Sequence, residues 1–556
     1  MSDQIGTAAV RAAAAAAWER HLGEPVDRER LLARLTAGSL HESFHATAVA
    51  GPDRPAIEIG SASVTHGELD ALAARMASAL ADREVAPGDA VLLTSPSSLA
   101  LITAYLGVLR LGAVAVPANP DYTAPELRHL IGDSGAVLVL ASGAALERAR
   151  VAAGGGGPEG AGGAAGGGGP EGAGGAAGGD APEVLDLDEL VNNLPGAALD
   201  PVPRERDSVA LLAYTSGTTG KPKCVPLTHA NLLASVRGYQ LAWRWSPDDV
   251  LVHGLPLFHQ HGLGGVHATL LAGSRAHILP RFDAAALCAA IAAARGTVLF
   301  CVPAMYERLV RWEGIEGAEL GSLRLLISGS APLSPSLARE ATRLIGQQPL
   351  DRYGTTESGL DVSTPYDGPR RIGMVGLALP GIEVAVVDPD GVPLAPGTDG
   401  EIVVRGPHVF SGYRGDVQAT AGTFYPGGWF RTGDLGRVDP GDGYLQITGR
   451  AKELIITGGL NVYPREVEHA LEEHAGVAAA AVVGVPSERW GEEVVAAIVA
   501  AGEGGVDEHE LIAFARSLLA PYKCPKRVVV VSELPRNALG KVVASEVLKV
   551  VGPSGA

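Results

Sequence analysis

Cysteine is scarce in this sequence of 556 residues, as are methionine and the aromatic residues. The four cysteines, Cys224, Cys288, Cys301 and Cys524, are scattered and form no CxxC pair. This spacing argues against a disulfide framework and against a zinc site. We therefore expect a protein of a reducing compartment, the cytoplasm.

Basic residues are in the minority. Lys and Arg number 44 against 62 Asp and Glu, which gives a formal net charge of −18. Because nucleic acids and anionic membrane surfaces are bound by basic patches, we expect neither as a partner. Arg110 interrupts the longest apolar run, Ala100 to Ala118, so no membrane span is predicted. The Ala-rich start, residues 1–40, predicts a helical extension rather than a signal peptide, because charged residues follow at once.

The length exceeds what one hydrophobic core usually holds, so we expect at least two domains. From Ala56 to Leu140, short apolar runs alternate with helical patterns, which is typical of an α/β fold with a parallel sheet. From about Glu453 the alternation predicts a small α+β domain. Between these regions, the unit GGGGPEGAGGAA occurs twice from Gly154. Because such a segment has almost nothing to bury, we predict a disordered insertion over residues 154–179.

A run that reads YTSGTTGKPK, Tyr214 to Lys223, follows the apolar segment SVALLA. Its glycines let backbone N–H groups converge on an anion, and its hydroxyls and lysines add donors and charge. The order of residues does not fit the Walker pattern, and a surface turn is the alternative. We predict a phosphate-binding loop made of Thr215, Ser216, Gly217, Thr218, Thr219, Gly220 and Lys221.

Four further motifs follow in order: YGTTE from Tyr353, TGDLG from Thr432, GRAKELIITGGLNVYPREVE from Gly449, and PRNALGK ending at Lys541. Together with the loop they resemble the adenylate-forming superfamily, which holds acyl-CoA synthetases, adenylation domains and luciferases. The resemblance runs from about Ser43 to Val543. It implies a large AMP-binding N-terminal domain of mixed sheets and helices, residues 41–450, and a small mobile α+β lid, residues 451–556.

The resemblance also implies roles for single residues. Adenine would lie between the ring of Tyr353 and a turn of small residues. Asp434 would accept the ribose hydroxyls, since a carboxylate has acceptors only. Lys541, Thr356 and Glu357 would be catalytic, and Glu357 would hold Mg²⁺. The other expected residues are Gly329, Ser330, Ala331, Gly354, Thr355 and Arg450 at ATP, His259 at the acid, Gly458 and Gly459 at CoA, and Lys452 as the hinge.

For several of these residues a structural role is the alternative interpretation. Tyr353 alone would fit core packing, and His259 is more often a structural group than a catalyst. Asp434 could be a solvated loop residue, and Lys541 a surface charge. Their positions within the motifs favour the functional interpretation.

The implied activity is that of an ATP-dependent carboxylic acid–CoA ligase that works through an acyl-adenylate. The acid's carboxylate would attack the α-phosphorus of MgATP while Lys541 and Mg²⁺ stabilise the developing charge. The lid would then turn at Lys452, and CoA would displace AMP. A carrier protein stays open as the thiol, although no carrier domain follows the lid. A luciferase-like oxygenase and a nucleotide sensor without catalysis are the alternatives from other classes.

Arg308, in VPAMYERL, is the specific hint about the acid. The surrounding segments look most like malonyl-CoA synthetases, in which this position holds the substrate's distal carboxylate. Arg is suited to that role because it grips a carboxylate bidentately. We therefore expect malonate or a similar short dicarboxylate. The alternative is an aromatic or fatty acid, with Arg308 on a solvated helix face.

Overall fold

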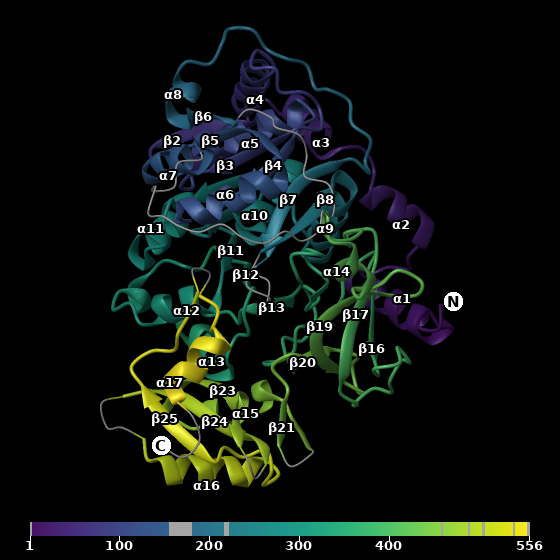
Figure 1. Ribbon diagram of the computed structural model, residues 1–556, viewed down its shortest axis with the longest axis vertical. Helices are drawn as coiled ribbons and strands as arrows, with labels where there is room; N and C mark the ends of the chain where they lie inside the picture. Colours follow the sequence, from purple (N-terminus) through teal and green to yellow (C-terminus); the bar gives the residue numbers. More distant parts are fainter. Residues whose placement is uncertain are drawn as a thin grey trace, which may run out of the picture.

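The computed structural model describes residues 3–154, 181–215, 222–457, 460–487, 490–502, 506–537 and 540–552. These residues form a large body up to strand β20 and a smaller body from β21 onward (Figure 1). Both contain helices and strands, so the expected α/β fold with a large N-terminal and a small C-terminal part is confirmed. The predicted insertion, apart from Gly154, lies outside the described residues.

The largest sheet among the described residues has nine strands in the order β15-β14-β13-β12-β11-β9-β10-β1-β2. Its strands are β1 (Pro55–Ile59), β2 (Ala62–Thr65), β9 (Val250–His253), β10 (Arg275–Ile278), β11 (Val298–Cys301), β12 (Leu325–Ser328), β13 (Leu350–Tyr353), β14 (Val362–Ser363) and β15 (Leu377–Ala378). The pairs from β1 to β13 are parallel, and β2, β14 and β15 add antiparallel ends. Strands β9, β11 and β12 are buried throughout, as parallel strands covered on both faces should be.

A second sheet has the order β6-β5-β3-β4-β7-β8. Its strands are β3 (Ala90–Thr94), β4 (Val114–Pro117), β5 (Ala136–Ala141), β6 (Glu183–Asp186), β7 (Val209–Thr215) and β8 (Lys223–Thr228). All neighbours are parallel except β7 and β8, which are antiparallel and flank the predicted phosphate loop. The loop therefore begins where a buried strand reaches its carboxyl end.

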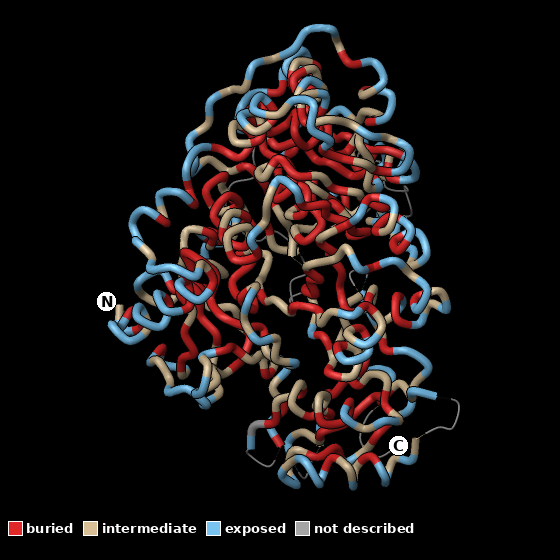
Figure 2. Tube along the Cα trace, turned by 180° about the vertical axis from the view of Figure 1, so that it is seen from behind, coloured by how far each residue is buried: buried red, intermediate tan, exposed pale blue. Residues whose placement is uncertain are grey.

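Helices cover both sheets and share one core between them. They are α3 (Leu40–Ala50), α4 (His66–Ala81), α5 (Leu99–Arg110), α6 (Ala124–Ser134), α7 (Ala144–Ala153), α8 (Leu187–Asn192), α9 (His229–Ala242), α10 (Gln260–Ala272), α11 (Ala284–Ala294), α12 (Pro303–Val310) and α13 (Pro335–Ile345). The largest core joins α4, α5, α9 and α10 to inner faces of both sheets. Helices α11 to α13 cover the outer face of the nine-stranded sheet, while α6 and α7 cover that of the six-stranded sheet. Figure 2 shows the resulting buried interior.

A third, antiparallel sheet has the order β16-β17-β19-β18, with β20 paired to β19. Its strands are β16 (Glu383–Val387), β17 (Gly400–Arg405), β18 (Phe424–Tyr425), β19 (Trp429–Val438) and β20 (Leu445–Arg450), and α14 (Val417–Ala421) lies between β17 and β18 in the chain. The register of β19 and β20 pairs Asp434 with Arg450. Two predicted site residues are thus fixed side by side by backbone pairing.

The N-terminal residues form helices α1 (Ala8–Leu22) and α2 (Arg28–Leu35), which pack on the large body. Trp18 is buried there, and its indole Nε1 donates to the carbonyl of Ile382 over 2.8 Å. Of the helices in the described ranges, none is long and apolar enough to cross a membrane.

In its described residues, the small body holds one sheet, β22-β21-β24-β23 with β25 on β24, and three helices. Its elements are β21 (Ile455–Thr457), β22 (Leu460–Val462), α15 (Pro464–Glu472), β23 (Val477–Ser487), β24 (Gly491–Ala500), α16 (Glu508–Leu518), β25 (Arg527–Val531) and α17 (Ala544–Val551). It has its own hydrophobic clusters on the two faces of this sheet. Helix α15 faces the large body near α13 and β20.

Candidate active site

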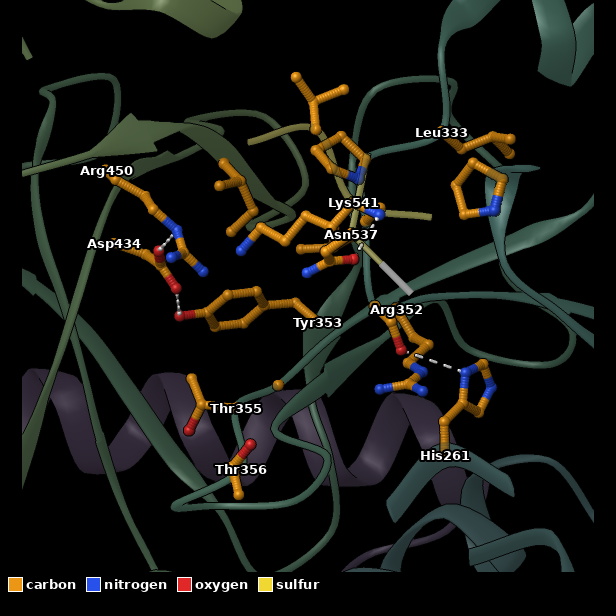
Figure 3. A pocket seen from close by; sticks show the side chains of 18 of the residues that line it. His261, Leu333, Arg352, Tyr353, Thr355, Thr356, Asp434, Arg450, Asn537 and Lys541 are labelled. Atoms are coloured by element: carbon orange, nitrogen blue, oxygen red, sulfur yellow. Dashed lines mark hydrogen bonds and ion pairs between the residues drawn. The ribbon is translucent and has the colours of Figure 1, made fainter. Parts of the chain in front are cut away.

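A cavity of about 1960 Å³ lies between the two bodies. Its wall is built from the ends of β7 and β13, the turn after β12, strands β19 and β20, and the small body's α15 and C-terminal loop. Residues from all five predicted motifs contribute to this wall. The cavity thus brings together segments that lie far apart in the sequence (Figure 3).

Asp434 lies at the centre of a small polar group in this cavity. One carboxylate oxygen accepts a hydrogen bond of 2.8 Å from the Tyr353 hydroxyl, and the other lies 3.1 Å from Nε of Arg450. A carboxylate has about four acceptor sites, so both oxygens keep capacity for a ligand hydroxyl. The three predicted nucleotide residues therefore form one preorganised set.

Lys541 comes from the small body and lines the same cavity. Its side chain extends toward Arg450 and Tyr353 (Figure 3). Its backbone N–H donates to Oδ1 of Asn537 over 3.0 Å, which fixes the loop that carries it. Burial, together with the charge of Arg450, lowers the pKa of Lys541 to about 8, while Asp434 and Glu453 oppose the shift. The side chain is thus mostly protonated at neutral pH, although its environment disfavours the charged form.

The YGTTE segment follows β13 and also lines the cavity. Gly354 is required there, because a Cβ atom would lie 2.0 Å from the carbonyl oxygen of Gly359. The hydroxyl of Thr355 lies 2.9 Å from that of Ser358, and the Thr356 carbonyl accepts from Gln260 over 2.8 Å. These contacts hold the segment in place beneath Tyr353 (Figure 3).

Glu357 has the chemistry of a magnesium ligand. One oxygen of its carboxylate accepts a hydrogen bond of 2.8 Å from the Tyr413 hydroxyl, which leaves the other oxygen available. Within the described ranges, no cluster of three or more His, Cys, Asp or Glu could hold a metal. Mg²⁺ needs few protein ligands when phosphates supply the rest, so this single carboxylate fits the ion.

The turn after β12 is strained at Ser330, whose φ of 69° lies in the left-handed region. Its hydroxyl lies 3.2 Å from Nδ1 of His261, and Ser330 and Ala331 line the cavity. Gly329, which precedes them, is not among the residues that line the cavity. A Cβ atom there would lie 2.2 Å from Nε of Arg352, so this glycine makes room for that side chain.

His259 lines the part of the cavity beside this turn. Burial and the charge of Arg352 lower its pKa to about 4, and the pKa of His261 is lowered by the same causes. Both rings are therefore neutral at pH 7. They can exchange hydrogen bonds with an acid but supply no positive charge to it.

The structure does not place Arg308 in the cavity, contrary to the interpretation of it as an acid-binding residue. Helix α12 buries Tyr306, Leu309 and Val310. The period of about 3.6 residues turns position 308 away from that face, and Arg308 is exposed. Its guanidinium donates to the Phe282 carbonyl over 3.4 Å and lies 4.7 Å from the centre of that ring.

Other predicted residues are placed only in part. Thr215, at the end of β7, and Lys452 both line the cavity. The remaining loop residues, Ser216, Gly217, Thr218, Thr219, Gly220 and Lys221, and the predicted CoA residues, Gly458 and Gly459, lie outside the described residues.

Three cavity residues were missed in the sequence. Lys223 lies 4.6 Å from the centre of the Tyr413 ring, and Tyr413 in turn holds Glu357. Lys223 is the second lysine of the run YTSGTTGKPK and could have been predicted from it. Nothing in the sequence points to Tyr413. Arg352 was overlooked because it directly precedes the more conspicuous Tyr353.

Comparison with known proteins gives consistent relatives. The family model described as AMP-binding enzyme matches residues 44–414, and the AMP-binding enzyme C-terminal domain matches residues 466–541. Feruloyl-CoA synthase of an Amycolatopsis species is 36% identical over 505 residues, which cover 90% of this chain and 96% of that protein. The mitochondrial malonate–CoA ligase of Mus musculus is 36% identical over 386 residues, 63% of this chain and 66% of that protein. The crystal structure of ATP-bound MatB from Rhodopseudomonas palustris is similar to this chain, with 35% sequence identity and a TM-score of 0.81. The match covers 92% of this chain and 98% of the MatB chain.

Proposed function

Because this chain belongs to the AMP-binding enzyme family and is an acid–thiol ligase, we propose that it activates a short dicarboxylic acid, malonate or a close analogue, as an acyl-adenylate and transfers the acyl group to CoA. One observation carries the adenylate step. Lys541 of the small body lines the same cavity as Tyr353, Asp434 and Thr356 of the large body. This arrangement supports the proposal, because it brings a cation into the cavity that we assign to the nucleotide.

In the first half-reaction, a carboxylate oxygen of the acid attacks the α-phosphorus of ATP. The bond from that phosphorus to the bridging oxygen breaks, and pyrophosphate leaves with the electron pair. Asp434, Tyr353 and Arg450 hold the nucleoside, while Lys541 stabilises the charge that develops at phosphorus. Glu357 would hold Mg²⁺, which supplies further positive charge to the phosphates.

In the second half-reaction, the thiol sulfur bonds to the acyl carbon, and AMP leaves as the bond from that carbon to its phosphate oxygen breaks. We assign Lys541 no role in this step, although it lines the cavity in this orientation of the small body. We therefore propose that the small body turns at Lys452 between the two half-reactions and presents Gly458 and Gly459 to the thiol. CoA is the proposed thiol, with a carrier protein as the alternative.

Two observations support a dicarboxylic acid. The sequence segments around the acid site resemble malonyl-CoA synthetases, and a relative at 36% identity is a malonate–CoA ligase. The feruloyl-CoA synthase relative keeps an aromatic acid as the second candidate. Fatty acids form a third class.

The proposal is tested by ATP–pyrophosphate exchange with a panel of acids, with and without CoA. We expect malonate or methylmalonate to support exchange without CoA, and to yield AMP and the acyl-CoA when CoA is added. Lys541→Ala should abolish exchange yet still form thioester from supplied acyl-AMP, because the lysine acts only on the first step. The proposal would be contradicted if none of the acids supported pyrophosphate exchange. It would also be contradicted if Lys541→Ala lost adenylate formation and thioester formation equally.

A further inference from the structure

Arg352 lies in the wall of the cavity and has no ion-pair partner among the described residues. Arg352 belongs to β13 and directly precedes Tyr353. Figure 3 shows its side chain beside His261, at the backbone end of Tyr353, whereas Asp434 lies at the hydroxyl end. In the part of the chain that the structure describes, no residue forms an ion pair or a hydrogen bond with this guanidinium.

The nearest carboxylates are engaged elsewhere. Asp361 accepts hydrogen bonds at both oxygens, from Nε2 of His408 over 2.7 Å and from the Ser358 hydroxyl over 2.8 Å. Asp351 accepts from the backbone N–H of Arg352 itself over 3.1 Å. Neither carboxylate forms a bidentate pair with the guanidinium, so its five donors remain available to a ligand.

The surroundings hold this cation in place, and the charges of Asp351 and Asp361 act on it although neither carboxylate pairs with it. The absence of a side chain at Gly329 leaves the space that Arg352 occupies. Tyr239 and Phe300 line the same region, and the Tyr239 hydroxyl is satisfied by the Gly264 carbonyl over 2.7 Å. His259 and His261 are neutral at pH 7, as argued above. Arg352 is half-buried, and burial lowers the pKa of its guanidinium, so an anion bound here would offset the unfavourable partial removal of its charge from water.

We propose that Arg352 binds the second carboxylate of the substrate and selects dicarboxylic acids. This inference rests on the proposed function. The reacting carboxylate must meet the nucleotide near Thr356 and Lys541. Arg352 lies away from Asp434, on the side of His261, where the rest of the acid would lie (Figure 3), and its charge also acts on His259. Its planar guanidinium can hold a carboxylate through two parallel hydrogen bonds, which a monocarboxylate of similar size cannot accept.

The test compares malonate with propionate in Arg352→Met, which keeps an unbranched apolar stem and removes the charge. We expect the wild type to favour malonate at least about tenfold in kcat/KM for pyrophosphate exchange, because the unmatched guanidinium penalises propionate. Arg352→Met should remove most of that preference, because malonate loses its partner and propionate no longer leaves a guanidinium unpaired; malonate turnover should fall, propionate turnover should rise, and the KM for ATP should stay close to the wild type. Arg308→Met is the matched control, because it removes the other candidate arginine, on α12. It should leave the preference for malonate over propionate unchanged.

Each alternative outcome is distinct. An unchanged acid ranking in Arg352→Met, or a loss of ranking in Arg308→Met instead, overturns the inference but leaves the ligase assignment in place. A raised KM for ATP with every acid also overturns it, since the guanidinium would then serve the nucleotide. If Arg352→Met does not fold, Arg352→Lys decides, because it keeps the charge but not the bidentate geometry. Its preference for malonate should fall at least about threefold, and an unchanged preference overturns the inference. If none of the acids supports pyrophosphate exchange in the wild type, the proposed function itself fails.

Discussion

The Lys541 ammonium loses its proton within an accessible range of pH. Burial disfavours the charged form, so the pKa falls from its ordinary value to about 8. Below that pH the side chain carries the charge that the proposed adenylate step uses, and above it the charge is lost. The free enzyme is therefore fully competent near neutrality and less so in alkaline solution.

We expect kcat/KM for pyrophosphate exchange to fall about tenfold per pH unit above about pH 8, because this parameter reports the titration of the free enzyme. The matched variant is Lys541→Arg, whose guanidinium stays protonated over this range. Its residual exchange should show no alkaline decline. The same decline in Lys541→Arg, or in thioester formation from supplied acyl-AMP, would assign the titration to another group.

Strand β13 and helix α12 show how far the sequence could predict the site. The motif YGTTE indicated a segment of the site, and its residues all line the cavity, as residues adjacent in the chain readily do. The resemblance pointed to Arg308 as the acid-binding residue, and Arg352 was not considered, although both stand in the sequence segments that form the site. The choice depends on which face of the strand and of the helix meets the cavity. That is decided by packing between elements, namely the burial of Tyr306 and Leu309 and the space left at Gly329.

The α/β fold itself was predictable, since buried parallel strands read as short apolar runs between helical patterns. The pairing of Asp434 with Arg450 was not. Their 16-residue separation is closed by the antiparallel register of β19 and β20, and register is set by the hydrophobic pattern and the turn together. Likewise, the contact of Tyr413 with Glu357 joins residues 56 positions apart.

The connection between α7 and β6 carries the repeated unit GGGGPEGAGGAA. Strand β6 pairs only with β5, at the edge of the six-stranded sheet, among the described strands. We expect removal of the second copy, residues 166–177, to leave kcat/KM unchanged and to shift Tm by no more than about 1 °C. The reason is that loop closure depends only weakly on length and the unit offers almost no apolar surface to bury. Thermal melting and exchange kinetics of the shortened chain check this, and a loss of folded enzyme would give the repeat a structural role.

The two bodies meet across a seam of charged side chains around the cavity. Arg339 of α13 lies 3.2 Å from Glu473, directly after α15, and Arg536 lies 3.9 Å from Glu307 of α12. Deeper in the seam, burial raises the pKa of Asp351 to about 7, and the charge of Arg465 on α15 opposes that shift. These contacts hold the small body in the orientation that brings Lys541 into the same cavity as Tyr353 and Asp434. They must separate if the small body turns between the two half-reactions.

Reversing one charge of the outer pair tests this coupling. Arg339 and Glu473 are both about half exposed, so their attraction contributes at most about 1 kcal/mol, or roughly fivefold in an equilibrium. We expect Arg339→Glu to slow pyrophosphate exchange by about two- to fivefold, because like charges then disfavour the orientation that presents Lys541. Thioester formation from supplied acyl-AMP should not slow, since that step requires the seam to open. The double variant Arg339→Glu with Glu473→Arg restores an opposite pair and should recover exchange. Equal slowing of both half-reactions, or no recovery in the double variant, would show that the pair does not bias the orientation of the small body.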